Sequence, residues 1–429
     1  MALPEAKRDA TEDRLAAMAR PASGAAWAEA ARDAALARFR TMGLPGRRDE
    51  YWRFTQPDTL NAPDAPKAAL LEADDVPAFT NLDRICLVFR DGVFDPDASD
   101  PLEGEGLEIE LFSDAVQRDI HWARDVYGQL EETAQTPVHR PFAALNTAFA
   151  TDGVVLRATG KATKPVHLRY LHEDENSDAI LRFVVRVESG AELTLLEGGP
   201  AAARFNKCME VEVADTGAFH HVRAQGRDHE RRAVTHLFAR LGEESVFKSF
   251  TLTANGRLTR NEAFIELKGD NATAHIAGAA VGDGDFHHDD TVFVTHDAVN
   301  CESRQVFKKV LRNGAVGAFQ GKILVKEGAQ KTDGYQISQS LLLDEDAQFL
   351  AKPELEIYAD DVACSHGSTS GAIDEEALFY LRSRGVHVDE AQDLLVLAFL
   401  AEAIDEIENE EIAEDILGRL SAWLVRHRK

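Results

Sequence analysis

Apolar and polar residues alternate through the middle of the chain, from about residue 151 to residue 363. Segments such as "LRFVVRVESGAELTLLEG" and "GAFQGKILVKEGAQKTDG" place apolar side chains at every second position, which is the spacing of a half-buried strand. Short turns with glycine separate the segments, as at Ser189-Gly190, Asn255-Gly256 and Asn313-Gly314. Because no helical period interrupts them, the pattern excludes a doubly wound α/β fold. It leaves a sandwich, a barrel or a β-solenoid.

Helical periodicity begins near the N-terminus of the sequence. Trp27, Ala31, Ala35 and Phe39 recur every four residues and predict one face of a helix. Gly43 follows at the position where a helix commonly ends in a left-handed conformation. We therefore expect a helix that ends at about residue 42.

The region between this helix and the alternating segments is mixed. The stretch "RICLVFRDGVF" predicts a strand that reaches a turn at Asp91-Gly92. Residues 111–149 have a helical pattern, with breaks expected at Pro137 and Pro141. The N-terminal part is thus predicted to be mostly helical.

Three helices are predicted at the C-terminal end. Asp374 is a candidate N-cap for "EEALFYLRSR", and a second helix is expected to start at Asp389. That second helix contains "LLVLAFLAEAI", which is apolar almost all round and predicts burial against more than one surface. A third is expected from about Asn409, and its apolar stripe comprises Ile412, Ile416, Leu420, Trp423 and Leu424.

Composition narrows the possible partners. Lys and Arg number 47 against 74 Asp and Glu, giving a formal charge of −27, which repels phosphate backbones and anionic membrane surfaces. No stretch approaches the roughly 18 apolar residues of a membrane span. We therefore expect neither nucleic-acid nor membrane binding.

The cysteines are few and scattered. Cys86, Cys208, Cys301 and Cys364 form no CxxC pair and fit neither a zinc ribbon nor a disulfide framework. The first residues are charged, without the apolar core of a signal peptide. Both observations predict reduced thiols and a cytoplasmic protein.

One candidate site lies in "YADDVACSHGSTSG". Cys364 and His366 stand two apart, so in a strand their side chains share one face. A thiolate and an imidazole are ordinary ligands of soft and borderline metals. The alternative is a buried cysteine beside an incidental histidine. This alternative stays open because a spacing of two residues is by itself a weak signal of a metal site.

A second candidate is "GDFHHDDTVFVTHDAVNCES". In a strand, His287 and Asp289 point one way, and His288 and Asp290 point the other; His296 and Cys301 follow nearby. Such a group could hold a metal in a cupin-like metalloenzyme using His287, His288, Asp289 and His296. The alternative is a polar strand edge. No GxSxG, HExxH or P-loop pattern offers self-contained catalytic chemistry.

Longer motifs carry a family resemblance. The segments "NCESRQVFKKVLRNGAVGAFQGKILV", "KPELEIYADDVACSHGSTSGAIDEEALFYLRSRG" and "GLPGRRDEYWRFT" resemble the SufB/SufD family of iron–sulfur cluster assembly proteins. The form "YADDVACSHG" resembles the SufD branch of that family. The SufB branch is expected to carry a cluster-related cysteine shortly before this region, where the present sequence has "LLLDEDAQF" and no thiol.

The resemblance implies an architecture of three parts. It implies a mostly helical N-terminal domain (1–150), a central right-handed parallel β-helix (151–371) and a C-terminal helical domain (372–429). Within the family, the β-helix pairs with a SufB-like paralogue. The C-terminal helices seat a SufC-type ABC ATPase.

The resemblance also implies a function. It implies a non-catalytic scaffold subunit that builds and delivers nascent clusters, with ATP hydrolysis left to SufC. His366 matches the family's functional histidine at the SufB interface, and Cys364 matches a neighbouring cysteine. The expected cofactor is a transient iron–sulfur cluster shared with the partner, with none held tightly by the isolated chain. A homodimer of the isolated chain is the alternative assembly.

Overall fold

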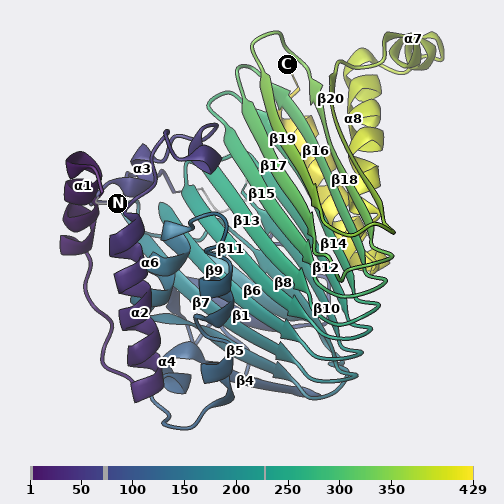
Figure 1. Cartoon of the computed structure of the whole chain (residues 1–429). Coiled ribbons are helices and arrows are strands. Elements are labelled where there is room, and N and C mark those ends of the chain that lie inside the picture. The colour runs from purple at the N-terminus through teal and green to yellow at the C-terminus, as the bar shows by residue number, and fades with distance from the viewer. Residues whose placement is uncertain (1–2, 71–75, 227–228, 429) are drawn as a thin grey trace.

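The protein is built mainly from two long parallel sheets (Figure 1). The computed structural model describes residues 3–70, 76–226 and 229–428. The described strands of one sheet are given in the order in which neighbouring strands pair. They are β2 (Val93–Phe94), β1 (Ile85–Arg90), β6 (Val166–Leu171), β8 (Glu192–Gly198), β10 (Ala218–Gln225), β12 (Val246–Ala254), β14 (Thr273–Asp283), β16 (Glu302–Arg312), β18 (Asp333–Leu342) and β20 (Ala363–Gly371).

The second sheet is assembled in the same way from the intervening strands. From one edge to the other it contains β3 (Glu103–Gly104), β4 (Leu107–Leu111), β5 (Asp152–Ala158), β7 (Asp178–Val187), β9 (Arg204–Val213), β11 (Arg232–Leu241), β13 (Leu258–Leu267), β15 (His287–His296), β17 (Val316–Val325) and β19 (Gln348–Ile357).

The two sheets form a β-solenoid. From β5 onward, odd-numbered strands pair in parallel with odd-numbered strands and even with even, so each coil contributes one strand to each sheet. Alternate side chains from both sheets fill the interior, among them Phe183, Phe219 and Ile265. The prediction of a parallel β-helix is confirmed, and the sandwich and the barrel are excluded.

Residues with a left-handed backbone conformation form the turns between successive strands of the solenoid. Asn255 and Gly256 have φ of 51° and 130°, and Asn313 and Gly314 have φ of 51° and 81°. Glycine and asparagine adopt this conformation at the least cost, which is why these pairs mark turns in the sequence. The turn at Asp91-Gly92 is likewise left-handed, with φ of 48° and 86°.

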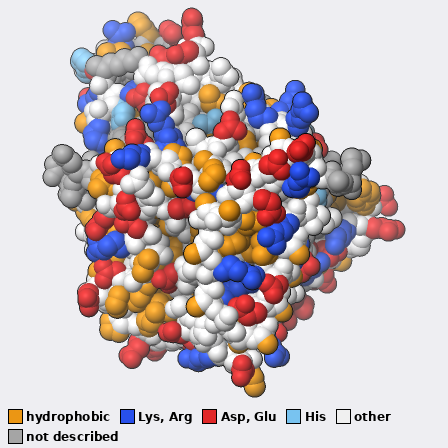
Figure 2. Space-filling view, turned by 90° about the vertical axis from the view of Figure 1, so that its left-hand side faces the viewer, with side chains coloured by type: hydrophobic (Ala, Val, Ile, Leu, Met, Phe, Trp, Pro, Cys, Tyr) orange, Lys and Arg blue, Asp and Glu red, His pale blue; other side chains and the backbone are white. Residues whose placement is uncertain are grey.

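The N-terminal helices cover the outer face of the odd-numbered sheet (Figure 1). They comprise α1 (Glu5–Ala16), α2 (Ala26–Met42), α3 (Asp58–Asn61), α4 (Phe112–Ala115), α5 (Gln129–Thr133) and α6 (Pro141–Phe149), with 3-10 turns η1 (Glu50–Trp52) and η2 (Trp122–Asp125). On this side of the molecule acidic, basic and apolar side chains are interspersed (Figure 2).

Two details of the N-terminal region differ from expectation. Pro141 begins α6 instead of breaking a helix, because the first turn of a helix needs no proline N–H. Residues 85–111 also contribute β1 to β4, which join the ends of both sheets. The division of the chain at residues 150 and 371 stays a prediction, since the sheets run on across the first of these positions.

The C-terminal helices α8 (Val388–Ile404) and α9 (Glu410–Arg426) cover the outer face of the even-numbered sheet, and α7 (Glu375–Ser383) stands away from it (Figure 1). Asp374 and Asn409 cap α7 and α9 as expected. The cap of α8 is His387 and not Asp389, and Leu394 on α8 remains 45% exposed. Because α8 packs against β14 and β16 of the sheet and against both α7 and α9, its predicted burial against more than one surface is confirmed. No described helix is long and apolar enough to cross a membrane.

Candidate functional site at the open end of the solenoid

The last coil of the solenoid has no neighbour on its far side. In the sheets as described, β20 pairs only with β18 and β19 pairs only with β17. Both strands are long, at nine and ten residues, so their outer edges present rows of backbone donors and acceptors. Such an edge is a template for pairing with another chain.

The register of β20 decides where its polar side chains point. Gln336 on β18 lies opposite His366, and Gln305 on β16 lies opposite Gln336. On β16 this face belongs to the interior, since neighbouring Phe307 packs in the core. His366 therefore continues an interior column at the point where the solenoid opens.

Cys364 lies on the same inward face. It is opposite Gly334, where an added Cβ would approach the thiol Sγ to 3.2 Å, so glycine there leaves room for the sulfur. Cys364 is half-buried and packs against a small cluster that includes Ile323 and Ala329. Burial raises the pKa of this thiol, so a proton must leave before the sulfur can bind iron.

His366 is exposed, in contrast to the fully buried Gln336 beneath it. Gln336 donates from Nε2 to Oε1 of Gln305 at 2.8 Å, which fixes its amide inside the coil. In the part of the chain that the structure describes, no side chain forms a hydrogen bond with the His366 ring. The imidazole is therefore free to take a ligand or proton from outside.

The strand places two further hydroxyls beside this pair. Ser368 and Ser370 follow on the same face and bond to Ser338 and Ser340 of β18, each at 3.1 Å between hydroxyl oxygens. We missed both serines in the sequence, although the alternation in "CSHGSTSG" contained the signal. A thiol, an imidazole and two hydroxyls thus form one polar row along an open edge.

The row cannot complete a metal site by itself. No three His, Cys, Asp or Glu side chains among the described residues are grouped so that they could hold a metal ion. Iron in clusters takes mainly thiolates, and histidine can replace a thiolate on an iron. A metal bound at this row would need further ligands from outside the described residues.

The second candidate cluster is divided by the sheet. On the outer face, Thr55 of the N-terminal region donates to Asp289 at 2.6 Å and lies 2.9 Å from Nε2 of His287. Asp289 also forms an ion pair with Arg260. Burial lowers the pKa of His287 to about 4, so it is neutral near pH 7. These groups join the N-terminal region to β15.

On the inner face, the remaining members have other partners. Lys309 donates to Asp290 at 2.7 Å and lies 3.0 Å from Nδ1 of His288. His296 bonds to Ser303 at 2.8 Å, and Cys301 donates to a backbone carbonyl. The cupin-like alternative is not supported, because the cluster is split between two faces and its charges are paired within the protein.

Exposed apolar side chains mark a second surface, on α7. Phe379 and Tyr380 are 74% and 55% exposed, and no residue of this helix is buried. The sequence predicted the helix but not the exposure of its aromatic residues. Large exposed aromatics on a helix that stands clear of the core are typical of a protein interface.

The comparisons with known proteins agree with this architecture. Residues 170–399 match the family described as "SUF system FeS cluster assembly, SufBD core domain", and residues 21–166 match "SufBD protein N-terminal region". The iron–sulfur cluster assembly protein SufD of Escherichia coli is 30% identical, covering 89% of this chain and 90% of that protein. An iron–sulfur cluster assembly SufBD family protein of Synechocystis is 28% identical, over 86% of this chain and 84% of its own length. SufD of Bacillus subtilis is 27% identical over 64% of this chain and 65% of that protein. The chain is a solenoid with Cys364 and His366 at its open end, and most of its length matches these proteins. It belongs to the SufBD family of iron–sulfur cluster assembly proteins.

Proposed function

We propose that this chain is a non-catalytic scaffold subunit in the cytoplasm. It pairs with a SufB-like paralogue and with a SufC-type ATPase to build and deliver nascent iron–sulfur clusters. The observation that carries the proposal is the row of Cys364 and His366 on an uncovered strand edge. Four free cysteines support a reducing compartment.

The paralogue docks through the open end of the solenoid. The outer edges of β19 and β20 supply backbone groups for strand addition. A strand laid against β20 would bring partner side chains beside His366 and Cys364. The nascent cluster then forms between the two chains, with His366 as one ligand and thiolates of the partner as others. Without the paralogue, a second copy occupies the same edge as a homodimer.

The ATPase docks on α7. Phe379 and Tyr380 provide aromatic anchors, which usually carry most of the binding energy of an interface. The acidic turn "DEIENEE" between α8 and α9 is partly used within the chain. Glu406 pairs with His275 at 2.8 Å and Glu408 with Lys248 at 2.6 Å, so these two carboxylates hold the turn on the sheet. The anchors on α7 are therefore the sharper target.

Reconstitution of the complex tests the cluster site. The wild-type chain, His366→Ala, Cys364→Ser and the same-face control Ser370→Ala are each combined with the paralogue and the ATPase. Iron and sulfide are then measured. We expect His366→Ala to lose most of both, Cys364→Ser to lose less and Ser370→Ala to retain them. Full cluster content in the His366→Ala complex would contradict the proposed role.

Two further measurements test the partners. Phe379→Ser with Tyr380→Ser should weaken ATPase capture more than tenfold, whereas Ile120→Ser, at an 85% exposed position on the N-terminal side, should not. The isolated wild-type chain should turn over no ATP. Turnover that survives removal of copurified ATPase would contradict a scaffold.

A further inference from the structure

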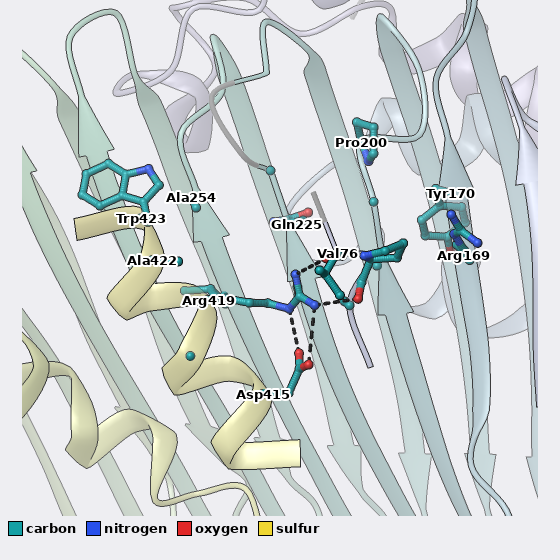
Figure 3. Close-up of a pocket in the computed structure, with 18 of the residues that line it drawn as sticks. Val76, Arg169, Tyr170, Pro200, Gln225, Ala254, Asp415, Arg419, Ala422 and Trp423 are labelled. Carbon is teal, nitrogen blue, oxygen red and sulfur yellow. Dashed lines mark hydrogen bonds and ion pairs between the residues drawn. The ribbon is translucent and has the colours of Figure 1, made fainter. Parts of the chain in front are cut away.

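A large cavity lies on the outer face of the even-numbered sheet, away from His366. It has a volume of about 1310 Å³ and lies between α9, the ends of β6, β8, β10 and β12, and the segment from residue 76 to residue 82 (Figure 3). Arg419 of α9 fixes one wall by bonding to Asp415 and to the carbonyl oxygens of Val76 and Pro77. Three distant parts of the chain therefore form the walls of this cavity.

Two buried donors line this cavity without a partner. Arg84 donates from Nε to Nδ1 of His167 at 3.0 Å, so the ring hydrogen of His167 lies on Nε2. That Nε2 has no hydrogen-bond partner although His167 is fully buried, and the same is true of Nε1 of Trp423, which is 3% exposed. An unmade buried hydrogen bond costs about 1–3 kcal/mol, which a ligand with acceptor oxygens would recover.

The cavity also has unpaired positive charge. Arg169 lines it beside His167, and no carboxylate of the described residues forms an ion pair with Arg169. Arg169 is half-buried, and an arginine without a carboxylate partner in such a position is suited to pair with an anion.

The electrostatic surroundings agree with this assignment. Burial and the nearby charges of Arg84, Arg169 and Arg419 lower the pKa of His167 to about 3, which keeps the ring neutral and its Nε2–H a donor. The carboxylates near the cavity are partly neutralised, because Asp415 pairs with Arg419 and Glu173 with Arg90. Glu411 and Glu414 also line the cavity, and both are exposed to solvent.

Much of the lining is apolar. Leu82, Leu252, Ala254, Leu420 and the ring of Trp423 belong to the cluster that joins α9 to the sheet. The backbone of Gly198 forms part of the floor, where a Cβ would approach Ala78 and His167 to 3.0 and 3.2 Å. A site with an apolar body and a few donors at one end is the usual form of a small-molecule pocket.

We propose that this cavity binds a small organic anion with an apolar body. The anionic group faces Arg169 and the Nε2–H of His167, the body lies over Leu252 and Ala254, and an acceptor atom reaches Nε1 of Trp423. The site is separate from the cluster site on β20. It is formed within a single chain.

Two dyes with the same aromatic body test the proposal. Anilinonaphthalene sulfonate carries an anion, and N-phenyl-1-naphthylamine is its uncharged analogue. Each is titrated against the full chain by fluorescence. We expect saturable binding of the sulfonate at one site per chain. Arg169→Ala should weaken the sulfonate about tenfold and leave the uncharged dye unchanged, since one charge-assisted hydrogen bond is lost.

Controls separate this site from other surfaces. Ala422→Phe places a ring into the cavity from an exposed position on α9 and should weaken both dyes, whereas Arg48→Ala, at an exposed arginine, should weaken neither. Thermal midpoints show that each variant folds. The proposal is overturned if the sulfonate does not saturate, if Arg169→Ala leaves its affinity unchanged, or if Phe379→Ser on α7 abolishes its binding.

Discussion

The two ends of the solenoid are finished in opposite ways. At the first end, β2 and the β3–β4 hairpin run antiparallel to their neighbours, and β2 and β3 are only two residues long. The loop after β2 also bonds to the edge of β1, where the N–H groups of Cys86 and Val88 donate to Asp100 and Ser99. At the last end, β19 and β20 keep long open edges. One end is protected against strand addition, and the other is left available for it.

The contrast separates an end that is closed by local contacts from an end that we propose to be functional. Short antiparallel strands and satisfied N–H groups are the usual protection of a sheet edge. The open end forgoes that protection along the strand that carries Cys364 and His366. Four measurements test this contrast between the two ends, in order of decreasing effect.

The first compares packing at the two ends. Phe89 is fully buried in the first coil and contacts the rings of Phe94, Tyr170 and Phe183, so Phe89→Ala should lower the free energy of unfolding by about 3–5 kcal/mol. Phe349 in the last coil is only half-buried, and Phe349→Ala should cost about 1 kcal/mol. Urea unfolding measures both, and equal losses would contradict the difference between the ends.

The second concerns acid sensitivity of the interior. Burial lowers the pKa of His296 to about 4, against about 6.5 in an unfolded chain. Between these values the unfolded chain binds a proton that the folded chain does not, so stability is full above pH 6.5 and falls as the pH drops to 4. His296→Gln should reduce the loss between pH 7 and pH 4.5 by about 2 kcal/mol.

Ser303, whose hydroxyl lies 2.8 Å from Nε2 of His296, provides the matched control for that measurement. Ser303→Ala removes the same hydrogen bond but no titrating group, so the loss of stability between pH 7 and pH 4.5 should stay as in the wild type. If Ser303→Ala reduces that loss as much as His296→Gln does, protonation of His296 is not its cause.

The third tests the edges directly. Gly367 on β20 has no heavy atom within 4 Å of an added Cβ, so Gly367→Lys places a charge on the open edge without a clash. We expect it to weaken binding of the paralogue about tenfold or more, because edge lysines oppose strand addition. Val93→Lys, at a 63% exposed position on β2, should have no effect. Equal affinities in a calorimetric titration would place the interface elsewhere.

The fourth is the smallest effect and concerns folding at the cluster site. His366→Ala removes an exposed side chain without a side-chain hydrogen bond in the described residues, so it should change the free energy of unfolding by less than about 0.5 kcal/mol. A larger loss, together with lost cluster content in the reconstituted complex, would indicate a structural histidine.

Sequence patterns predicted those features that are local. The alternation of residues 151–363, the left-handed turns at Asn255 and Asn313 and the caps at Asp374 and Asn409 each depend on a few adjacent residues, and the structure has all of them. The shared face of Cys364 and His366 likewise follows from their spacing of two. The roles of those two residues stay a prediction.

Features that depend on distant residues were missed. Thr55 lies 234 positions from the carboxylate of Asp289 that it bonds, and no periodicity relates them. The split of the His287 cluster and the cavity at Arg169 have the same origin, because each is completed by a segment that folds onto the sheet from another part of the chain. Alternation places a side chain on a face but does not say what covers that face.

The protected first end also limits how large an assembly can become. If both ends accepted strands, copies could add head to tail, and an interface of that kind continues into a filament unless a rotation closes it. Among the described strands, β2 and β3 close one end, so strand addition of the kind proposed above would join two solenoids last coil to last coil. Such a joint would cover the open edges of both chains. Strand addition would then stop at two solenoids, with the polar row on β20 between them.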